Sequence, residues 1–196
     1  NKEALDSGEK DLKSITFDAS PESIALVEGY LNRFRESVAG WEADFGKEQM
    51  TKELSWMNLS WSGDAQWAID EAAEIGLELR YEVPASGSTV WFDGWVIPKY
   101  AKNVKAARYF INFLCMPENA IRNMDYIGYV STIGGKEILE SMSDEEFEPI
   151  DAEYFFGEGA DSVRINPVMY PDAATIERCG MMHDSGTDEL LKMWSR

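Results

Sequence analysis

The sequence predicts an α/β fold, because strand-like and helix-like patterns alternate in the first half of the chain. Residues 53–61, "ELSWMNLSW", form a mixed apolar run that is typical of a buried parallel strand. A turn over residues 62–64 follows, and a helical pattern then continues to Gly76, a residue type that favours helix ends. Residues 77–84, "LELRYEVP", have the pattern of the next strand. A strand–helix–strand unit of this kind usually forms a parallel pair.

Helical spacing recurs in other parts of the chain. Ser20 and Pro21 suit the cap and the first position of a helix whose apolar residues recur as far as Phe34. Asn103, Pro117 and Gly128 supply similar start and stop signals further along. We therefore expect further helices over residues 101–115, 117–128, 134–142 and 185–196. Residues 143–171 are rich in acids, glycine and proline, and they predict a long surface connection with a short helical turn over residues 143–147.

Composition excludes several classes of function. Acidic residues outnumber basic ones by 36 to 18, and the resulting net charge of −18 disfavours nucleic-acid binding, which needs a basic surface. The same charge suits cationic partners, although a solvated acidic surface also explains it. No apolar run reaches the length of a membrane span. His183 is the sole histidine, so the sequence predicts no metal site and no cofactor.

The two cysteines lie far apart in the sequence. Cys115 ends the apolar run "RYFINFLC" on a predicted helix, where a buried free thiol is the expected state. A disulfide with Cys179 is the alternative, because two cysteines can pair in only one way.

Aromatic residues at the ends of predicted elements point to a binding pocket. Trp61 closes a predicted strand, Trp91 opens another after a Ser/Gly stretch, and Tyr129 follows a helix-stopping glycine. In a strand, residues 91 and 93 face the same side about 7 Å apart, so Trp91 and Asp93 would present a ring and a carboxylate together. That pair suits a protonated amine, because the carboxylate neutralises the charge and the ring attracts it. Packing in the core is the alternative explanation for each aromatic residue taken singly.

The sequence gives weaker evidence for a second acid in the pocket and for catalytic residues. Asp64 is either a second acid of the pocket or a partner of the following helix N-terminus. An acid pair for glycoside hydrolysis would need two carboxyl groups across a cleft, and no pair among the many acids stands out. Ser/His/Asp catalysis would rest on His183 alone, without a nucleophile elbow. The alternative hypotheses are a receptor for a sugar, a small cation or another amine, a hydrolase that uses Asp93 or Asp64, and a purely structural module.

Three blocks of sequence resemble a known family. They are "LSWSGDAQWAIDEA", "TVWFDGWVIPKYAKNVKAARYFINFLCMPENAIRNMDYIGYVS" and "YPDAATIERCG". Their order and spacing are similar to those in the carboxyl-terminal half of the spermidine/putrescine-binding proteins of bacterial ABC importers. The resemblance covers roughly residues 20–196.

The resemblance implies a periplasmic-binding-protein-like fold of type II, in which two α/β lobes enclose a ligand cleft. Residues 1–90 and 138–196 would belong to the second lobe, and residues 91–137 to a returning segment of the first. The implied function is non-enzymatic binding of spermidine or putrescine in the periplasm or elsewhere outside the cytoplasm, with or without a lipid anchor. The implied partner is the membrane permease of the importer. The rest of the first lobe, and any signal or anchor, would lie upstream of Asn1.

The resemblance also assigns roles to individual residues. Trp61 and Trp91 would pack on the ligand, Asp93 would bind an amino group, and Tyr129 would line the site. Met182 falls near the position of a glutamine in the family, which leaves the choice between spermidine and putrescine open. Without the upstream lobe, the apolar face of "YFINFLC" would be exposed, so we expect a companion fragment, a homodimer or rearranged packing.

Overall fold

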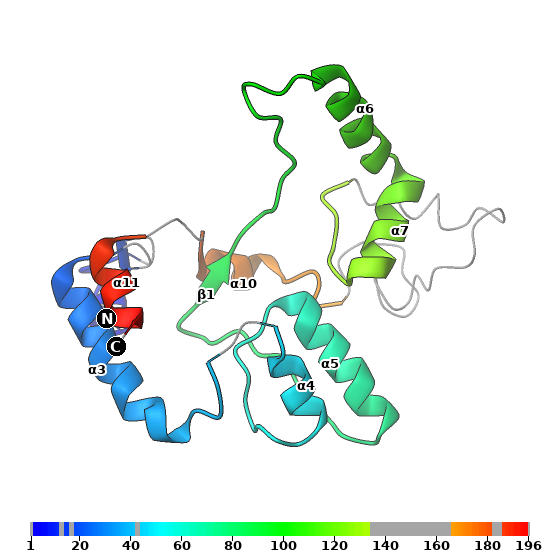
Figure 1. Cartoon of the computed structure of the whole chain (residues 1–196). Helices are drawn as coiled ribbons and strands as arrows, with labels where there is room; N and C mark the ends of the chain where they lie inside the picture. Colours follow the sequence, from blue (N-terminus) through cyan, green and yellow to red (C-terminus); the bar gives the residue numbers. More distant parts are fainter. Residues whose placement is uncertain are drawn as a thin grey trace. The chain divides into compact units, whose positions relative to one another are not determined.

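The computed structural model describes residues 2–11, 14–15, 18–41, 44–133, 166–181 and 186–195. The chain divides into two compact units. Figure 1 labels most of the helices and strands along the chain. The first unit contains Asn1–Ala43, Glu82–Phe92 and Ala173–Arg196. The second unit contains Asp44–Tyr81 and Asp93–Asp172. No described helix combines the length and apolar character needed to cross a bilayer.

The first unit combines helices with a small parallel sheet. Its elements are α1 (Lys2–Asp6), α3 (Pro21–Phe34), η1 (Arg35–Ser37), β1 (Ser88–Val90), α10 (Ala173–Glu177), β2 (Cys179–Met181) and α11 (Asp188–Trp194). Helix α11 packs on α3. The Trp41 and Trp194 rings meet edge to face, with centroids 5.7 Å apart. Such an aromatic pair adds stability beyond the area that it buries.

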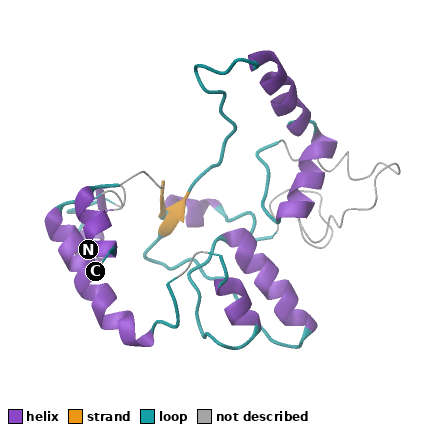
Figure 2. Ribbon diagram, viewed as in Figure 1, coloured by secondary structure: helices purple, strands orange, loops and turns teal. Residues whose placement is uncertain are grey.

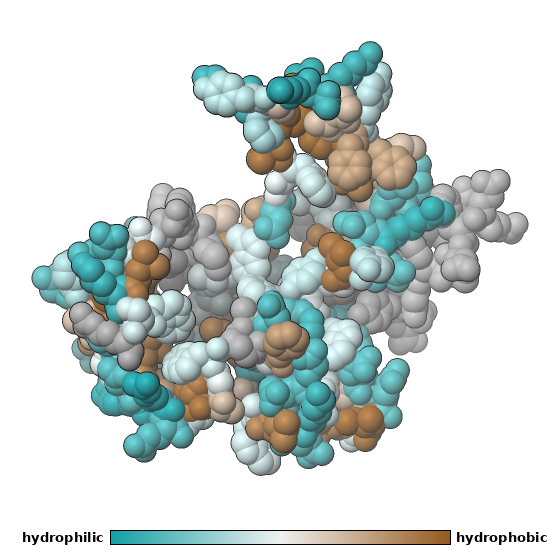
Figure 3. All heavy atoms as spheres, viewed as in Figure 1, coloured by the Kyte–Doolittle hydropathy of each residue, from teal (hydrophilic) through white to brown (hydrophobic). Residues whose placement is uncertain are grey.

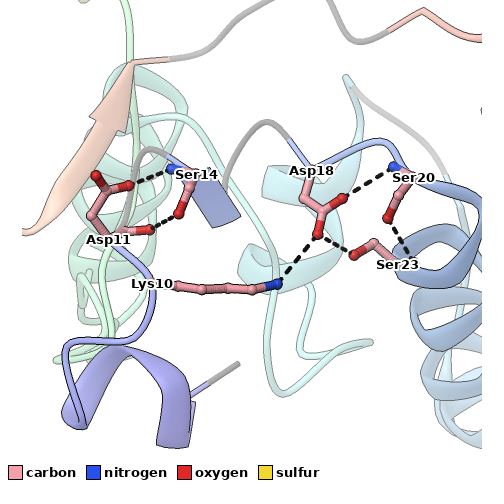
Figure 4. Close-up of polar contacts among 6 residues, drawn as sticks. All are labelled: Lys10, Asp11, Ser14, Asp18, Ser20 and Ser23. Carbon is pink, nitrogen blue, oxygen red and sulfur yellow. Dashed lines mark hydrogen bonds and ion pairs between the residues drawn. The ribbon is translucent and has the colours of Figure 1, made fainter.

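The start of α3 follows the predicted capping pattern. Ser20 is the cap, and its hydroxyl accepts a hydrogen bond from the Ser23 backbone N–H, while Pro21 occupies the first turn. Asp18 reinforces this cap, because its carboxylate accepts hydrogen bonds from the Ser20 N–H at 3.1 Å and the Ser23 hydroxyl at 2.6 Å (Figure 4). The Lys10 ammonium lies 3.6 Å from the same carboxylate. The hydrogen bonds from Ser20 and Ser23 hold the pKa of Asp18 well below its ordinary value.

The sheet pairs two segments that were not predicted to be paired strands. β1 and β2 run parallel, with Ser88 opposite Cys179 and Val90 opposite Met181 (Figure 2). The strands predicted over residues 53–61 and 77–84 are wrong, since neither segment has regular secondary structure, and so is the strand expected to open at Trp91, because β1 ends at Val90. Neither has a ladder partner among the described residues, and an apolar run becomes a strand only when its backbone groups are paired.

The second unit is helical in its described residues. It contains α4 (Gly46–Thr51), α5 (Ser62–Glu74), α6 (Val104–Leu114) and α7 (Pro117–Ile127). Helix α5 buries Ala65, Ala68 and Ala72 on one face. Helix α7 buries a face of its own that includes Ile121 and Met124. The predicted helices are confirmed as α3, α5, α6, α7 and α11, although α5 already begins at Ser62, within the segment expected to form a turn; α4 was not predicted.

Glycine ends two of these helices as expected. Gly128, after α7, has φ +71°, and Gly76, after α5, has φ +76°. Only glycine adopts this left-handed conformation without strain, so both residues can stop a helix at little cost. The predicted helix over residues 134–142 and the helical turn over 143–147 lie outside the described residues.

Helix α6 carries a largely exposed apolar face, on which the Phe110 ring meets the Trp95 ring edge to face with centroids 5.6 Å apart. None of its residues is buried, and Tyr109, Phe110 and Phe113 are 64%, 52% and 53% exposed. Apolar side chains are visible at the top of the space-filling view, where this helix lies (Figure 3). The expected exposure of "YFINFLC" is thus confirmed. Cys115 is a free and exposed thiol, so the prediction of a buried thiol is wrong, because nothing described covers that end of α6; Cys179 is also free.

Candidate functional site

The first turn of α5 carries the acid of the candidate site. Trp61 is the residue before the helix and adopts an extended backbone, with φ −70° and ψ 155°, but its side chain makes no capping hydrogen bond. Asp64 lies in the first turn rather than at the cap position. A carboxylate there is stabilised by the positive end of the helix dipole. The side chain of Asp64 is 20% exposed, so its charge is partly shielded from water.

Two groups from distant segments meet the Asp64 carboxylate. The Lys47 ammonium lies 2.6 Å from Asp64 Oδ1, a short charge-assisted hydrogen bond. The Tyr129 hydroxyl donates a longer hydrogen bond of 3.5 Å to Asp64 Oδ2. Each carboxylate oxygen therefore has a donor of its own, one cationic and one neutral.

Glycine allows Tyr129 to reach this carboxylate. Tyr129 follows the left-handed Gly128 that ends α7. Its ring lies directly against Gly63, where an added Cβ would be only 2.5 Å from Tyr129 Cε2. Burial raises the pKa of Tyr129 to about 12, and the Asp64 charge acts in the same direction. The phenol therefore stays protonated and able to donate at neutral pH.

Helix α4 presents Lys47 to the site. The helix begins at Gly46, whose backbone lies so close to the Asn58 side chain that an added Cβ would collide with it. α4 packs on α5. The Lys47 ammonium also lies 5.4 Å from the centre of the Trp67 ring on α5. Lys47 thus contacts a carboxylate and an indole face together, which are the two groups expected to bind an amine.

A buried amide supports the next turn of α5. Gln66 is 8% exposed, and its amide donates to Asp70 Oδ1 at 3.0 Å. Its carbonyl oxygen accepts a hydrogen bond of 3.3 Å from the Asn166 amide. These contacts fix the helix surface beside Asp64. The described residues hold no cluster of three histidine, cysteine or acidic side chains that would bind a metal.

The predicted site residues divide between the two units. Trp61, Asp64 and Tyr129 belong to the second unit, and the structure brings Asp64 and Tyr129 into contact. Trp91 is half-buried in the first unit, whereas Asp93 is exposed in the second. β1 ends at Val90, so no regular strand carries both residues, and their common orientation stays a prediction. Met182 lies outside the described residues.

Sequence reasoning missed Lys47, Trp67 and Gln66. The segment around Lys47 had no strong helical period, and Trp67 resembled an ordinary exposed position on a helix. A weak signal existed in Gly46 and Gly63, because glycine inside or at the start of a helix often marks a close approach of two segments.

The raised pKa of Tyr129 predicts a loss of stability in alkali. An unfolded tyrosine ionises near pH 10, whereas Tyr129 in the folded protein keeps its proton to about pH 12. The unfolded state therefore binds fewer protons between these values, and stability falls as pH rises through this range. Thermal melting from pH 9 to 11.5 should show a shallower decline for Tyr129→Phe than for wild type. Tyr126→Phe, which changes a 91% exposed neighbour, is the control; identical declines for all three proteins would contradict the assignment.

The sequence matches one protein family and several individual proteins. Residues 4–136 match the family described as bacterial extracellular solute-binding protein. The putrescine-binding periplasmic protein PotF of Escherichia coli is 29% identical over 117 residues, covering 59% of this chain and 26% of that protein. The spermidine/putrescine-binding periplasmic protein of Salmonella typhimurium is 26% identical over 168 residues, covering 85% of this chain and 41% of that protein.

A third relative has a slightly different named ligand. The putrescine/agmatine-binding protein of Pseudomonas aeruginosa is 33% identical over 135 residues, covering 58% of this chain and 37% of that protein. The chain thus spans between 26% and 41% of the length of these relatives. No solved structure gives a significant match. Because the family match extends over more than half of its residues, this chain belongs to the bacterial extracellular solute-binding protein family.

Proposed function

We propose that the protein is a receptor for polyamines such as putrescine and spermidine and that it serves an ABC importer without catalysing a reaction. The observation that carries the proposal is the Asp64 carboxylate, which already holds an ammonium group 2.6 Å away beside an aromatic ring. The three relatives described above are named for putrescine, spermidine or agmatine, all of which are cationic amines. Site chemistry and family membership therefore support the same class of ligand.

A polyamine needs more than one anionic contact. Its ammonium groups are separated by methylene chains, so a matching site has carboxylates apart from each other with aromatic surface between them. We assign one ammonium group to Asp64 and another to the exposed Asp93, with Trp61 and Trp91 covering the methylenes. Met182 remains a candidate contact for the far end of the ligand. The net charge of −18 would raise the local concentration of cations around the protein.

We place this site in a receptor of two lobes. The family implies a periplasmic-binding-protein-like fold, and we assign residues 1–90 and 138–196 to one lobe and 91–137 to a returning part of the other. One boundary between the compact units, between Phe92 and Asp93, lies close to the proposed lobe boundary at residues 90 and 91, although the same division groups residues 44–81 with residues 93–172. Ligand binding between lobes generally closes such receptors by hinge motion, and the permease would then recognise the closed state. We accordingly propose an extracytoplasmic location, in the periplasm or on a lipid anchor.

Asp93→Asn tests the assignment of the second carboxylate. Isothermal titration calorimetry on the full-length protein should show binding of putrescine or spermidine with a micromolar or tighter dissociation constant. The substitution should weaken that binding by about 1 kcal/mol or more, because one charged hydrogen-bond partner is lost. Asp6→Asn, which removes an exposed charge from α1, should have little effect. A neutral sugar serves as the ligand control, and an unchanged affinity for Asp93→Asn would remove Asp93 from the site.

We further propose that the apolar face of α6 is covered in solution. Exposed faces of this kind mark interaction surfaces, and a companion fragment, a second copy or repacking of the chain would cover it. Size-exclusion chromatography with light scattering should give a mass above that of the single chain, 22.2 kDa, or an expanded monomer. A compact monomer of 22.2 kDa would contradict the proposal.

A further inference from the structure

We propose that Lys47 is a tethered competitor for the ammonium subsite at Asp64, so that an amine ligand must displace it in order to bind there. The proposal rests on the polyamine function proposed above and identifies a residue that sets affinity at the same carboxylate. It makes Lys47 a determinant of ligand selection rather than a ligand contact.

The geometry of Lys47 reproduces the contacts that an alkylamine would make. Its ammonium lies 2.6 Å from Asp64 Oδ1 and 5.4 Å from the centre of the Trp67 ring. Its side chain is an ammonium group on four methylenes, which is the chemical structure of one end of a polyamine. A free amine placed on Asp64 Oδ1 would therefore meet Lys47 in the position that it needs.

The pair is also accessible. The side chains of Lys47 and Asp64 are 28% and 20% exposed, and Trp67 is 38% exposed. An ion pair that is partly open to solvent exchanges more readily than a sealed one, because water assists the separation of the charges. A ligand can thus reach the carboxylate without unfolding either helix.

The packing of α4 does not depend on the ion pair alone. Helix α4 packs along α5, and Gly46 leaves room for the Asn58 side chain at the start of α4, so α4 has contacts that do not involve the Lys47 side chain. Tyr129 supplies Asp64 with a neutral donor that would remain when the ammonium moves away. Lys47 can therefore leave while the carboxylate keeps its orientation.

Competition of this kind selects ligands by their number of charges. A monoamine forms one contact at Asp64 but breaks the contact between Lys47 and Asp64. The net free energy of its binding is therefore close to zero. A diamine or triamine forms a second ammonium contact elsewhere in the site, so its binding remains favourable. Specificity for polyamines then arises because Lys47 disfavours the binding of ligands with a single ammonium group.

The test is a mutant cycle with charge-matched controls. Lys47→Met removes the ammonium but keeps an unbranched side chain on Trp67, and calorimetry should show putrescine or spermidine binding about three- to tenfold tighter than in wild type. The increase in affinity should be absent when Asp64 is also changed: the Lys47→Met/Asp64→Asn double variant should bind no more tightly than Asp64→Asn alone. Lys47→Arg, which keeps the pair, should show no gain. Lys52→Gln changes an exposed lysine just after α4 and controls for the general effect of one lost positive charge.

The outcomes distinguish the competitor role of Lys47 from the polyamine function. If wild type binds amines and Lys47→Met binds them equally or more weakly, the competitor role is overturned and the receptor function stands. The competitor role is likewise overturned if Lys52→Gln increases the affinity as much as Lys47→Met does. It is also overturned if Lys47→Met increases the affinity equally when Asp64 is already replaced by Asn. If no variant binds any amine, both proposals fail. Thermal melting shows whether each variant is folded. If Lys47→Met does not fold, Lys47→Gln provides a second neutral substitution.

Discussion

The partly buried carboxylate of Asp64 is the group on which the arrangement of the second unit depends. A charge that is largely withdrawn from water needs partners, and here they arrive from segments 17 and 65 residues away in sequence. Helix α4 supplies the ammonium, α5 supplies the acid, and the segment after α7 supplies the phenol. One carboxylate thus joins three parts of the chain, through an ion pair with Lys47 and a hydrogen bond from Tyr129.

Two glycines make this meeting sterically possible. Gly63 leaves room for the Tyr129 ring beside the first turn of α5, and Gly46 lets the start of α4 approach Asn58. A methyl group at Gly63 would collide with the Tyr129 ring, and one at Gly46 would displace the Asn58 side chain. The functional chemistry of the site is therefore set in part by residues that carry no functional group.

The helices were predictable from local signals, whereas the sheet was not. Pro21 and Gly128 mark helix boundaries through their own backbone preferences, so the adjacent sequence is sufficient to predict them. A strand depends on a partner that can lie anywhere in the chain. Trp56 and Leu59 looked like core residues of a strand, yet they are 99% and 102% exposed, because their segment has no described neighbour to pair with. The strand that does form, Ser88–Val90, pairs with a distant segment that has no distinctive pattern.

The candidate site was predictable in the same uneven way. Trp61, Asp64 and Tyr129 attract notice because they lie at element ends, and two of them are in contact. Lys47 did not stand out, because a lysine on a short polar helix is usually solvated and only the tertiary contact reveals its partner. Trp91 and Asp93 were paired on the assumption of a shared strand, but the strand ends at Val90, so their roles rest on the family resemblance and on the test of Asp93.

A crystal structure of the protein with putrescine bound would show directly whether Asp64 binds the ligand. We expect a ligand nitrogen within hydrogen-bonding distance of Asp64, with the Lys47 ammonium moved away from that carboxylate and Tyr129 still beside it. A ligand bound elsewhere, with the contact between Lys47 and Asp64 intact, would contradict this expectation.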